Sequence, residues 1–440
     1  MKQCGARILL AILLALGTAG GAWAGTIYVK ADATGANSGA SWTAAFTDLQ
    51  DALATSTQGD EIWVAAGTYK PTSGTDRTKS FVMKAGVALY GGFAGIETET
   101  TRTQRDWTAH LTILSGDIGT SGTISDNSNS VVIGANNAVL DGFTITGGNA
   151  NGSLGYGNGG GMINDSVSPT IANCTFSGNV NVYAGGQGGG MHNSNASPTV
   201  TNCTFSGNTA ESGGGIYNAA ASPTVLNCTF SGNVASAGDG GGMENVGSSP
   251  TVINCTFTGN AAYVDFNLNG LGGGMDIDSG SPTLINCTFT GNVSNFYGSG
   301  SGMDIYAASP TVTNCIFWGD DATYGPEICN LFASGNPTFF HCDIQGSLEI
   351  GDGHAIGTVG EGNIMSDPLF VNAAHPAGAD GIWRTADDGL RLQAGSPCID
   401  AGLATGAPLT DILGYPRVGA PDIGAYETIR NAVGNWALYQ

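Results

Sequence analysis

Apolar and polar positions alternate with a fixed spacing along residues 159–342. One unit opens with glycines and Met191, passes Pro198, and continues through Val200, Cys203 and Phe205 to Ser-Gly-Asn. Its second half is rich in residues that favour strands, and no part of the repeat has the i, i+3, i+4, i+7 apolar spacing of a helix. We therefore predict short strands from which Val200, Cys203 and Phe205 point inward.

This unit occurs seven times, 25–32 residues apart, and the cysteine always follows the proline by five residues. The seven cysteines are Cys174, Cys203, Cys228, Cys255, Cys287, Cys315 and Cys342. All variation in length falls between the asparagine that closes one unit and the glycines that open the next. A fixed core with one variable point per repeat is typical of a solenoid whose loops emerge on one face.

We predict an all-β fold, a right-handed parallel β-helix of about ten coils, because stacked coils share a core that one coil cannot form alone. The first coils are the less regular stretches Asp60–Tyr69 and Val87–Phe93, and Leu140–Ile145 then matches the spacing of the repeat, with Phe143 in place of the cysteine. The β-helix is expected to cover residues 59–345. Residues 25–58 should form a strand and a helix from Trp42 to Ala54 that caps the open end.

The motifs Gly-Gly-Gly-Met/Ile and Phe-Ser/Thr-Gly-Asn resemble those of the polymorphic outer-membrane protein repeats. From about Asp60 to Cys342 the chain is similar to the pectate-lyase-like β-helix superfamily. Within residues 346–440, the segments Asp367–Phe370, Gly395–Gly402 and Asp422–Glu427 resemble the choice-of-anchor Q domain of bacterial surface proteins. The first two resemblances imply the fold, and the last implies a protein of the cell surface. None implies an activity, because one fold carries many functions.

Residues 1–24 have the features of a secretory signal peptide. Lys2 and Arg7 precede an apolar run, Ile8–Leu16, and Ala22–Ala24 provides a cleavage site before Gly25. The run is too short to span a bilayer, and no other stretch is long enough, so no membrane-spanning segment is expected. We expect a secreted or cell-surface protein of a bacterium.

The chain is strongly acidic, with 35 Asp and Glu against 13 Lys and Arg and a net charge of −22. This balance argues against binding to nucleic acid or to an anionic bilayer. Between Asp106 and Trp383 there is no Lys or Arg. A lyase of the pectate-lyase type, as that resemblance would imply it, needs a basic residue there, so cleavage of acidic polysaccharide is not expected.

The cysteines suit a buried stack of thiols better than disulfides. Ten are present, and one lies in the leader, which leaves an odd number. In-register cysteines on neighbouring parallel strands point the same way, which is poor disulfide geometry. We expect reduced thiols that act as small hydrophobic groups. A disulfide from Cys329 to Cys315 or Cys342 stays open.

The residue after each Met or Ile of the glycine motif should form an outward column, and three of its members are candidate catalytic acids: Glu244, Asp276 and Asp304. On neighbouring coils they would lie about 5 Å apart. Two carboxylates at a suitable separation are what a glycan hydrolase uses. Close like charges also raise each other's pKa or recruit a cation. The alternative is a solvated acidic face without a function.

Nearby loops carry Tyr263, Phe266, Phe296 and Tyr297, which could stack on sugar rings or pack on one another. Calcium is the one cofactor considered. Its candidate ligands are Asp276 and Asp304 on the column and Asp387 and Asp388 in a C-terminal acidic turn. A solvated turn without an ion is the favoured alternative for the last two.

Two functions remain open from the sequence. One is a non-enzymatic, adhesin-like β-helix that presents loops to an extracellular glycan or to a host or cell-surface protein. The other is a polysaccharide hydrolase or lyase that uses Glu244, Asp276 and Asp304. The missing basic residues favour the first.

Overall fold

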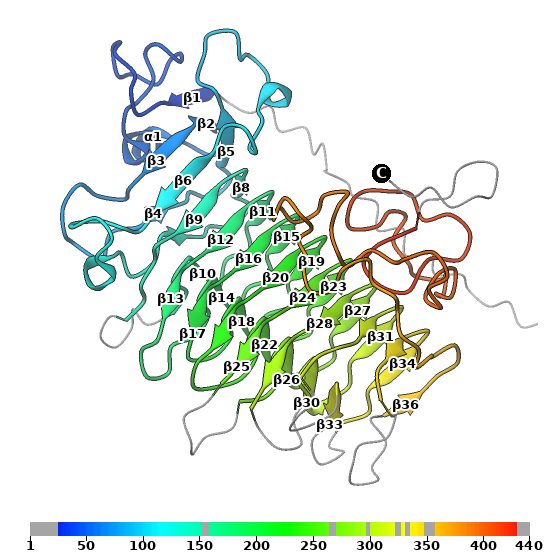
Figure 1. Cartoon of the computed structure of the whole chain (residues 1–440). Helices are drawn as coiled ribbons and strands as arrows, with labels where there is room; N and C mark the ends of the chain where they lie inside the picture. Colours follow the sequence, from blue (N-terminus) through cyan, green and yellow to red (C-terminus); the bar gives the residue numbers. More distant parts are fainter. Residues whose placement is uncertain are drawn as a thin grey trace, which may run out of the picture.

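The computed structural model describes residues 25–151, 158–263, 270–295, 300–321, 327–330, 335–346 and 357–428. These residues form a right-handed parallel β-helix of about nine turns, with α1 (Leu49–Thr55) near its N-terminal end (Figure 1). The predicted fold class is confirmed, and the number of turns is close to the ten that were expected.

The strands form three long parallel sheets, A, B and C, and a short sheet D that is confined to the middle turns. Sheet A contains β1 (Thr26–Val29), β2 (Glu61–Ala65), β5 (Ala88–Phe93), β8 (Val139–Asp141), β11 (Thr170–Ala172), β15 (Thr199–Thr201), β19 (Thr224–Leu226), β23 (Thr251–Ile253), β27 (Thr283–Ile285), β31 (Thr311–Thr313), β34 (Thr338–Phe340) and β36 (Thr358–Val359). Sheet B contains β3 (Gly67–Tyr69), β6 (Thr112–Ser115), β9 (Thr144–Thr146), β12 (Thr175–Ser177), β16 (Thr204–Ser206), β20 (Thr229–Ser231), β24 (Thr256–Thr258), β28 (Thr288–Thr290), β32 (Ile316–Phe317) and β35 (Asp343–Ile344).

Sheet C contains β4 (Phe81–Val82), β7 (Val132–Ile133), β10 (Met162–Asp165), β14 (Met191–Ser194), β18 (Ile216–Ala219), β22 (Met243–Val246), β26 (Met275–Gly280), β30 (Met303–Ala308) and β33 (Ile328–Asn330). Sheet D contains β13 (Val180–Asn181), β17 (Thr209–Ala210), β21 (Val234–Ala235), β25 (Ala261–Ala262) and β29 (Val293–Ser294). Two 3₁₀ turns, η1 (Arg102–Gln104) and η2 (Ile124–Asp126), lie in the N-terminal loops.

Equivalent residues of successive turns pair in register, so the core consists of columns of like side chains. Phe205 on β16 pairs with Phe230 on β20, and their rings stack at 5.0 Å between centroids. Cys203, Cys228 and Cys255 are fully buried, which confirms that they stack inward. All nine described cysteines, Cys329 included, are reduced thiols, so the disulfide that the sequence left open does not form.

An asparagine before six of the core cysteines turns the chain from sheet A to sheet B, and His341 takes this place before Cys342. Asn202 has a φ of 53°, a left-handed conformation that asparagine tolerates better than most residues. Its amide donates to Asn173 at 3.2 Å, and Asn227 donates to Asn202 at the same distance. This corner ladder runs along the outer edge of the solenoid and consists of Asn173, Asn202, Asn227 and Asn254, followed by Asn286 and Asn314.

The C-terminal segment packs against this corner (Figure 1). It forms a second, small hydrophobic core to which Ile316 of β32 also contributes. The Asn254 amide donates to the carbonyl of Thr410 at 2.8 Å, and Asn286 donates to that of Asp422 at 2.9 Å. Arg417 donates to Asn254 Oδ1 at 3.1 Å and forms a buried 2.9 Å ion pair with Glu427. The corner ladder therefore serves as the docking edge for this segment.

The N-terminal cap differs from the prediction. The helix begins at Leu49, where Asp48 accepts a hydrogen bond from the Gln50 amide, and not at Trp42. Trp42 instead packs against Tyr28 and Phe93 in a separate aromatic cluster. At the other end β36 pairs with β34, so sheet A continues past residue 345, where the sequence had placed the end of the β-helix.

Candidate functional site

The residues that follow the core methionines form one column on the outer side of sheet C. Glu244 on β22 pairs with Asp276 on β26, and Asp276 pairs with Asp304 on β30. The column that the sequence predicts is thus present, and it comprises Ile163, His192, Tyr217, Glu244, Asp276 and Asp304, with Cys329 as a further member. The structure therefore brings the three candidate acids together on consecutive strands.

The acids of this column are not a solvated face, which corrects one alternative from the sequence. Glu244 is 7% exposed, Asp276 2% and Asp304 0%. They are covered because the chain doubles back just before each strand of sheet C. A Cβ on Gly240, whose φ is 67°, would lie 2.6 Å from the Cβ of Glu244. The opening glycine of the repeat is needed at this close approach, and the returning loop buries the column.

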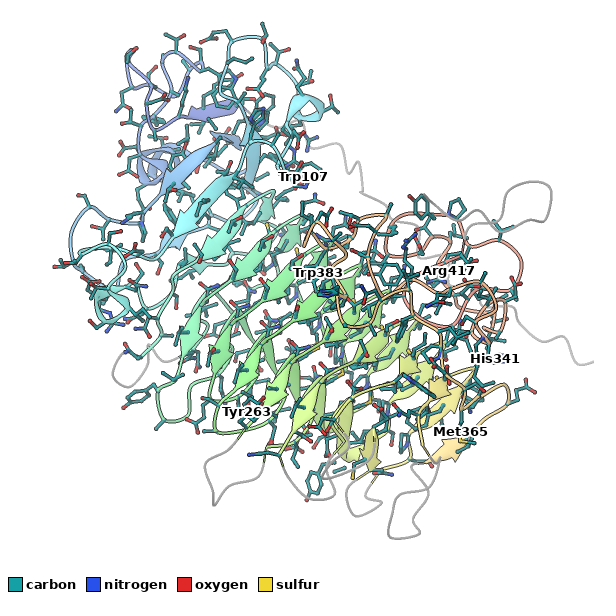
Figure 2. All side chains as sticks on the ribbon, in the orientation of Figure 1. Trp107, Tyr263, His341, Met365, Trp383 and Arg417 are labelled. Carbon is teal, nitrogen blue, oxygen red and sulfur yellow. The ribbon has the colours of Figure 1, made fainter. Side chains whose placement is uncertain are left out.

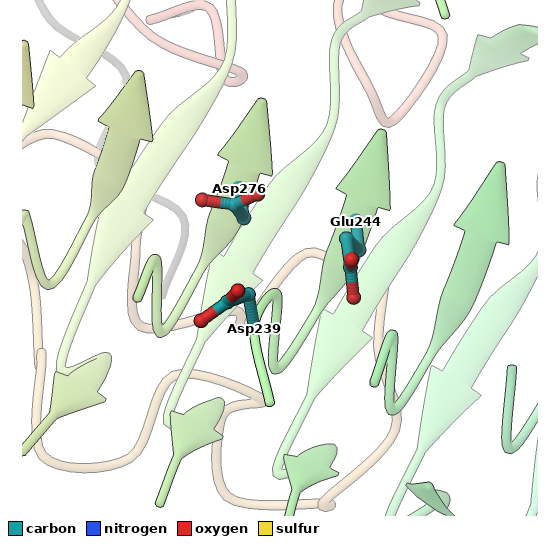
Figure 3. Close-up of side chains that lie close together, drawn as sticks. All are labelled: Asp239, Glu244 and Asp276. Atoms are coloured by element: carbon teal, nitrogen blue, oxygen red, sulfur yellow. The ribbon is translucent and has the colours of Figure 1, made fainter. Parts of the chain in front are cut away.

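Asp239 joins the acids from the loop between β21 and β22, directly before this reversal. Carboxylate oxygens of Asp239, Glu244 and Asp276 all lie within 4.8 Å of one another (Figure 3). The amide of Leu271 donates to Asp239 Oδ1 at 2.8 Å and ties the next loop to the group. Sequence reasoning missed Asp239, because it lies in a segment of variable length. Its place directly before a glycine triplet was the available signal.

Burial dominates the electrostatics of this group. It raises the pKa of Glu244 and of Asp276 well above the usual range, and the negative charge of Asp239 raises both further. Burial also raises the pKa of Asp239 to about 6. The pKa of Asp304 is raised to about 8, again chiefly by burial and against a hydrogen bond from the Gly300 amide. These carboxyl groups are therefore neutral at acidic pH and crowd together as charges only as the pH rises.

Several carboxylate oxygens of the column lack a donor. Glu244 Oε2, Asp276 Oδ1 and Asp304 Oδ2 are buried and have no hydrogen-bond partner in the part of the chain that the structure describes. Asp304 Oδ1 does accept from the Gly300 amide at 3.0 Å, and the Cys329 thiol also hydrogen-bonds to this carboxylate. A buried polar atom without a partner is costly, so these oxygens call for a proton or a cation.

Toward the N-terminus the same column is aromatic and uncharged. The His192 and Tyr217 rings stack at 5.6 Å between centroids. Burial lowers the pKa of His192 to about 4, so this side chain is neutral at physiological pH. It therefore supplies no positive charge beside the acids.

Of the four aromatic residues predicted to bind a ligand, the structure places one. Tyr263 directly follows β25 at the edge where the variable loops emerge, and it is 45% exposed (Figure 2). Phe266, Phe296 and Tyr297 lie outside the described residues. On the same edge, Val182 and Tyr183 directly follow β13 and are 53% and 38% exposed. Exposed apolar side chains thus lie at two points of this edge, and the two turns between them carry Glu211 and Ser236 at the equivalent position.

At the second candidate calcium site, the carboxylates of Asp387 and Asp388 accept hydrogen bonds from the chain itself. Asp387 Oδ2 accepts from the amide of Ala379 at 2.7 Å. Asp388 Oδ2 accepts from the Tyr426 hydroxyl, also at 2.7 Å, and from the amide of Arg384. Within the described ranges, these two residues form no cluster of three or more potential metal ligands. Their visible role is to hold the C-terminal segment together.

The comparisons with known proteins agree with the fold. A family model described as a right-handed β-helix region matches residues 117–296. The solved structure of the pectate lyase Pel9A is similar over 92% of this chain and 96% of its own, with 16% identity and a TM-score of 0.50. A rhamnogalacturonan lyase matches 84% of this chain and 96% of its own, with 12% identity and a TM-score of 0.40. No curated protein sequence matches. At 16% identity the likeness to Pel9A concerns the fold alone.

No helix in the described ranges is long and apolar enough to cross a membrane.

Proposed function

We propose that this protein is an exported, non-enzymatic β-helix that binds neutral glycans along the edge where the loops between sheets D and C emerge. The observation that carries the proposal is the exposure of Val182, Tyr183 and Tyr263 at that edge. Val182 follows β13 and Tyr263 follows β25, three strands further along sheet D, which is roughly 14 Å at the spacing of paired strands. Exposed aromatic rings on a rigid scaffold suit flat, partly apolar ligands such as sugar rings.

Charge favours a neutral ligand. Residues 107–382 contain no Lys or Arg, and His192 is uncharged at neutral pH. An acidic polysaccharide would meet only negative charge and hydrogen-bonding groups on this edge. A secreted or surface location is supported by the leader features of residues 1–24 and by the resemblance of the C-terminal segment to a surface-protein domain.

The burial of the acid column supports binding over catalysis. A general acid must come within hydrogen-bonding distance of the atom that it protonates. Glu244, Asp276 and Asp304 are at most 7% exposed beneath the returning loops, so a glycan on the outer surface would not reach them.

Calorimetric titration with neutral and acidic polysaccharides tests the proposal. We expect binding of a neutral glycan only, and Tyr263→Ala should weaken it about tenfold, which corresponds to about 1.4 kcal/mol. Tyr306→Ala is the matched control, because Tyr306 is 42% exposed on β30 of sheet C, off the loop edge. Binding of acidic polysaccharide alone, or equal affinity of the wild type and Tyr263→Ala, would overturn the proposal.

A second candidate, a hydrolase of neutral glycans, is favoured by one observation. The raised pKa values of Glu244 and Asp304, the latter about 8, are of the kind that general acids have. If the protein is such an enzyme, Asp276→Asn should abolish the release of reducing ends without loss of thermal stability. Unchanged turnover in that variant would exclude this role for the acid column.

A further inference from the structure

Three carboxylates converge where the loop between β21 and β22 packs on sheet C. Glu244 and Asp276 occupy paired positions on adjacent strands, and the reversal at Gly240 brings Asp239 in front of them (Figure 3). Their ligand oxygens lie within 4.8 Å of one another. Two oxygens bound to one Ca²⁺ can lie up to about 5 Å apart, because each Ca–O bond is about 2.3–2.6 Å long.

The position of this group is fixed by the fold. Glu244 and Asp276 belong to continuous strands, and the Leu271 amide holds Asp239 Oδ1 at 2.8 Å, which leaves its other oxygen available. The three side chains are therefore held in place by backbone structure, and a ligand would not have to assemble them.

A second observation points to a ligand. Glu244 Oε2 and Asp276 Oδ1 have no hydrogen-bond partner among the described residues, and these two residues are only 7% and 2% exposed. Asp304 adds a third unpartnered oxygen on the next strand. Buried carboxylates normally accept hydrogen bonds or are paired with a cation, and the rest of this chain satisfies most of its buried polar atoms. Three of the unpartnered carboxylate oxygens among the described residues thus lie on consecutive strands of sheet C.

We propose that Asp239, Glu244 and Asp276 bind one calcium ion, which ties the loop between β21 and β22 to sheet C. The donor set consists of oxygens only, which suits a hard cation and not zinc or copper. Calcium accepts irregular sets of oxygen ligands and completes them with water, whereas magnesium demands near-octahedral geometry. This inference stands apart from the proposed glycan binding, since it concerns a buried site and not the exposed loop edge.

Thermal denaturation of the full chain in chelator and in calcium chloride tests the site. The wild-type midpoint should rise by a few degrees with increasing calcium, because the ion binds only the folded state. Asp276→Asn should lose this rise, and its calorimetric affinity for calcium should fall at least tenfold. In chelator the same variant should melt no lower than the wild type, because it removes one crowded, unpartnered carboxylate.

Asp165→Asn is the matched control. Asp165 lies on β10 of the same sheet and is exposed, outside the acid group, so its variant should keep the full calcium response. The inference is overturned if the melting temperature of the wild type does not change with calcium, or if that of Asp276→Asn rises as much as that of the wild type.

Terbium luminescence locates the ion. Tyr217 pairs with Glu244 across β18 and β22, so light absorbed by its ring should be transferred to Tb³⁺ bound in the group. Tyr217→Phe should lose most of the emission and keep the calcium-dependent rise in melting temperature. Emission that persists in both Tyr217→Phe and Asp276→Asn would place the ion elsewhere and contradict the assignment.

Discussion

The amide ladders and the acid column of this protein stack with the same register and yet satisfy their polar groups very differently. In the core, Asn208 donates from its side chain to Asn233 Oδ1 at 3.0 Å, and Asn233 donates to Asn260 at 2.9 Å. An amide carries both donors and an acceptor, so each copy satisfies the next. On the outer side of sheet C, the carboxylates of Glu244 and Asp276 only accept, and both keep an oxygen without a partner.

The asparagine ladder of the core itself ends at a carboxylate. The core ladder ends where Asn292 donates to Asp320 Oδ1 at 2.7 Å, from its backbone and from its side chain. Asp320 thus reproduces the acceptor of an asparagine, but its carboxylate also faces that of Glu327, with which it must share a proton, and burial raises the pKa of Asp320 to about 6. A repeat built from self-complementary side chains can extend freely, whereas one built from carboxylates needs protons or cations to be buried.

The largest effect is expected where the self-satisfied ladder is interrupted. Asn233→Ala removes the acceptor for both the backbone and side-chain amides of Asn208, and it leaves the Phe205 carbonyl without its donor. Since each orphaned buried group costs about 1–3 kcal/mol, the free energy of unfolding should fall by about 3 kcal/mol or more. Urea denaturation measures this change.

Thr199→Ala, an exposed change on sheet A, is the control and should stay within about 0.5 kcal/mol of the wild type. Equal stability of the Asn233→Ala protein would show that the ladder contributes little to the fold.

The acid column should make the protein less stable as the pH rises in the absence of divalent cations. The folded pKa is raised from 3.8 to about 8 at Asp304 and to about 6 at Asp239, so the folded state holds these protons more tightly than the unfolded state. The stabilisation is therefore complete below about pH 4 and is lost as the pH rises toward 8.

Melting temperatures in chelator between pH 4 and pH 8 test this dependence. We expect a decline of several degrees, which Asp304→Asn should reduce and the exposed control Asp165→Asn should leave unchanged. A midpoint that rises steadily with pH over this range would contradict the assignment of buried, poorly neutralised acids.

A smaller effect is expected from the thiol column. Cys228 accepts from the Cys203 amide at 3.4 Å and donates to the Leu226 carbonyl at 3.2 Å, and both are weak sulfur hydrogen bonds. Cys228→Ala should therefore cost only about 1 kcal/mol, mostly from the small cavity that it leaves. A loss as large as that of Asn233→Ala, measured by the same urea denaturation, would mean that the thiols contribute far more than packing.

The sequence predicted the parts of the molecule that depend on register. The step from proline to cysteine, as from Pro198 to Cys203, is constant in the repeats, so equivalent residues of successive turns must align. This was enough to predict the core columns and the neighbouring positions of Glu244, Asp276 and Asp304. It could not predict their burial, because that depends on how loops of different lengths fold back over the strands.

For the same reason Asp239 was missed, since its distance from the strands is not set by the repeat. The helix prediction was wrong at Trp42. An apolar residue at that position suits a helix, but it suits equally the contacts that Trp42 makes with Tyr28 and Phe93. The docking of the C-terminal segment on Asn254 and Asn286 pairs residues more than a hundred positions apart. No periodicity in the sequence records such a contact.

The most direct test of the contrast between the two columns is a crystal structure of the protein grown near pH 7.5 with calcium chloride. The account predicts one ion among Asp239, Glu244 and Asp276, with bonds of about 2.3–2.6 Å to their oxygens, while the amide ladders are unchanged. Carboxylates that instead hydrogen-bond to one another with no ion between them, or that turn out into solvent, would contradict it.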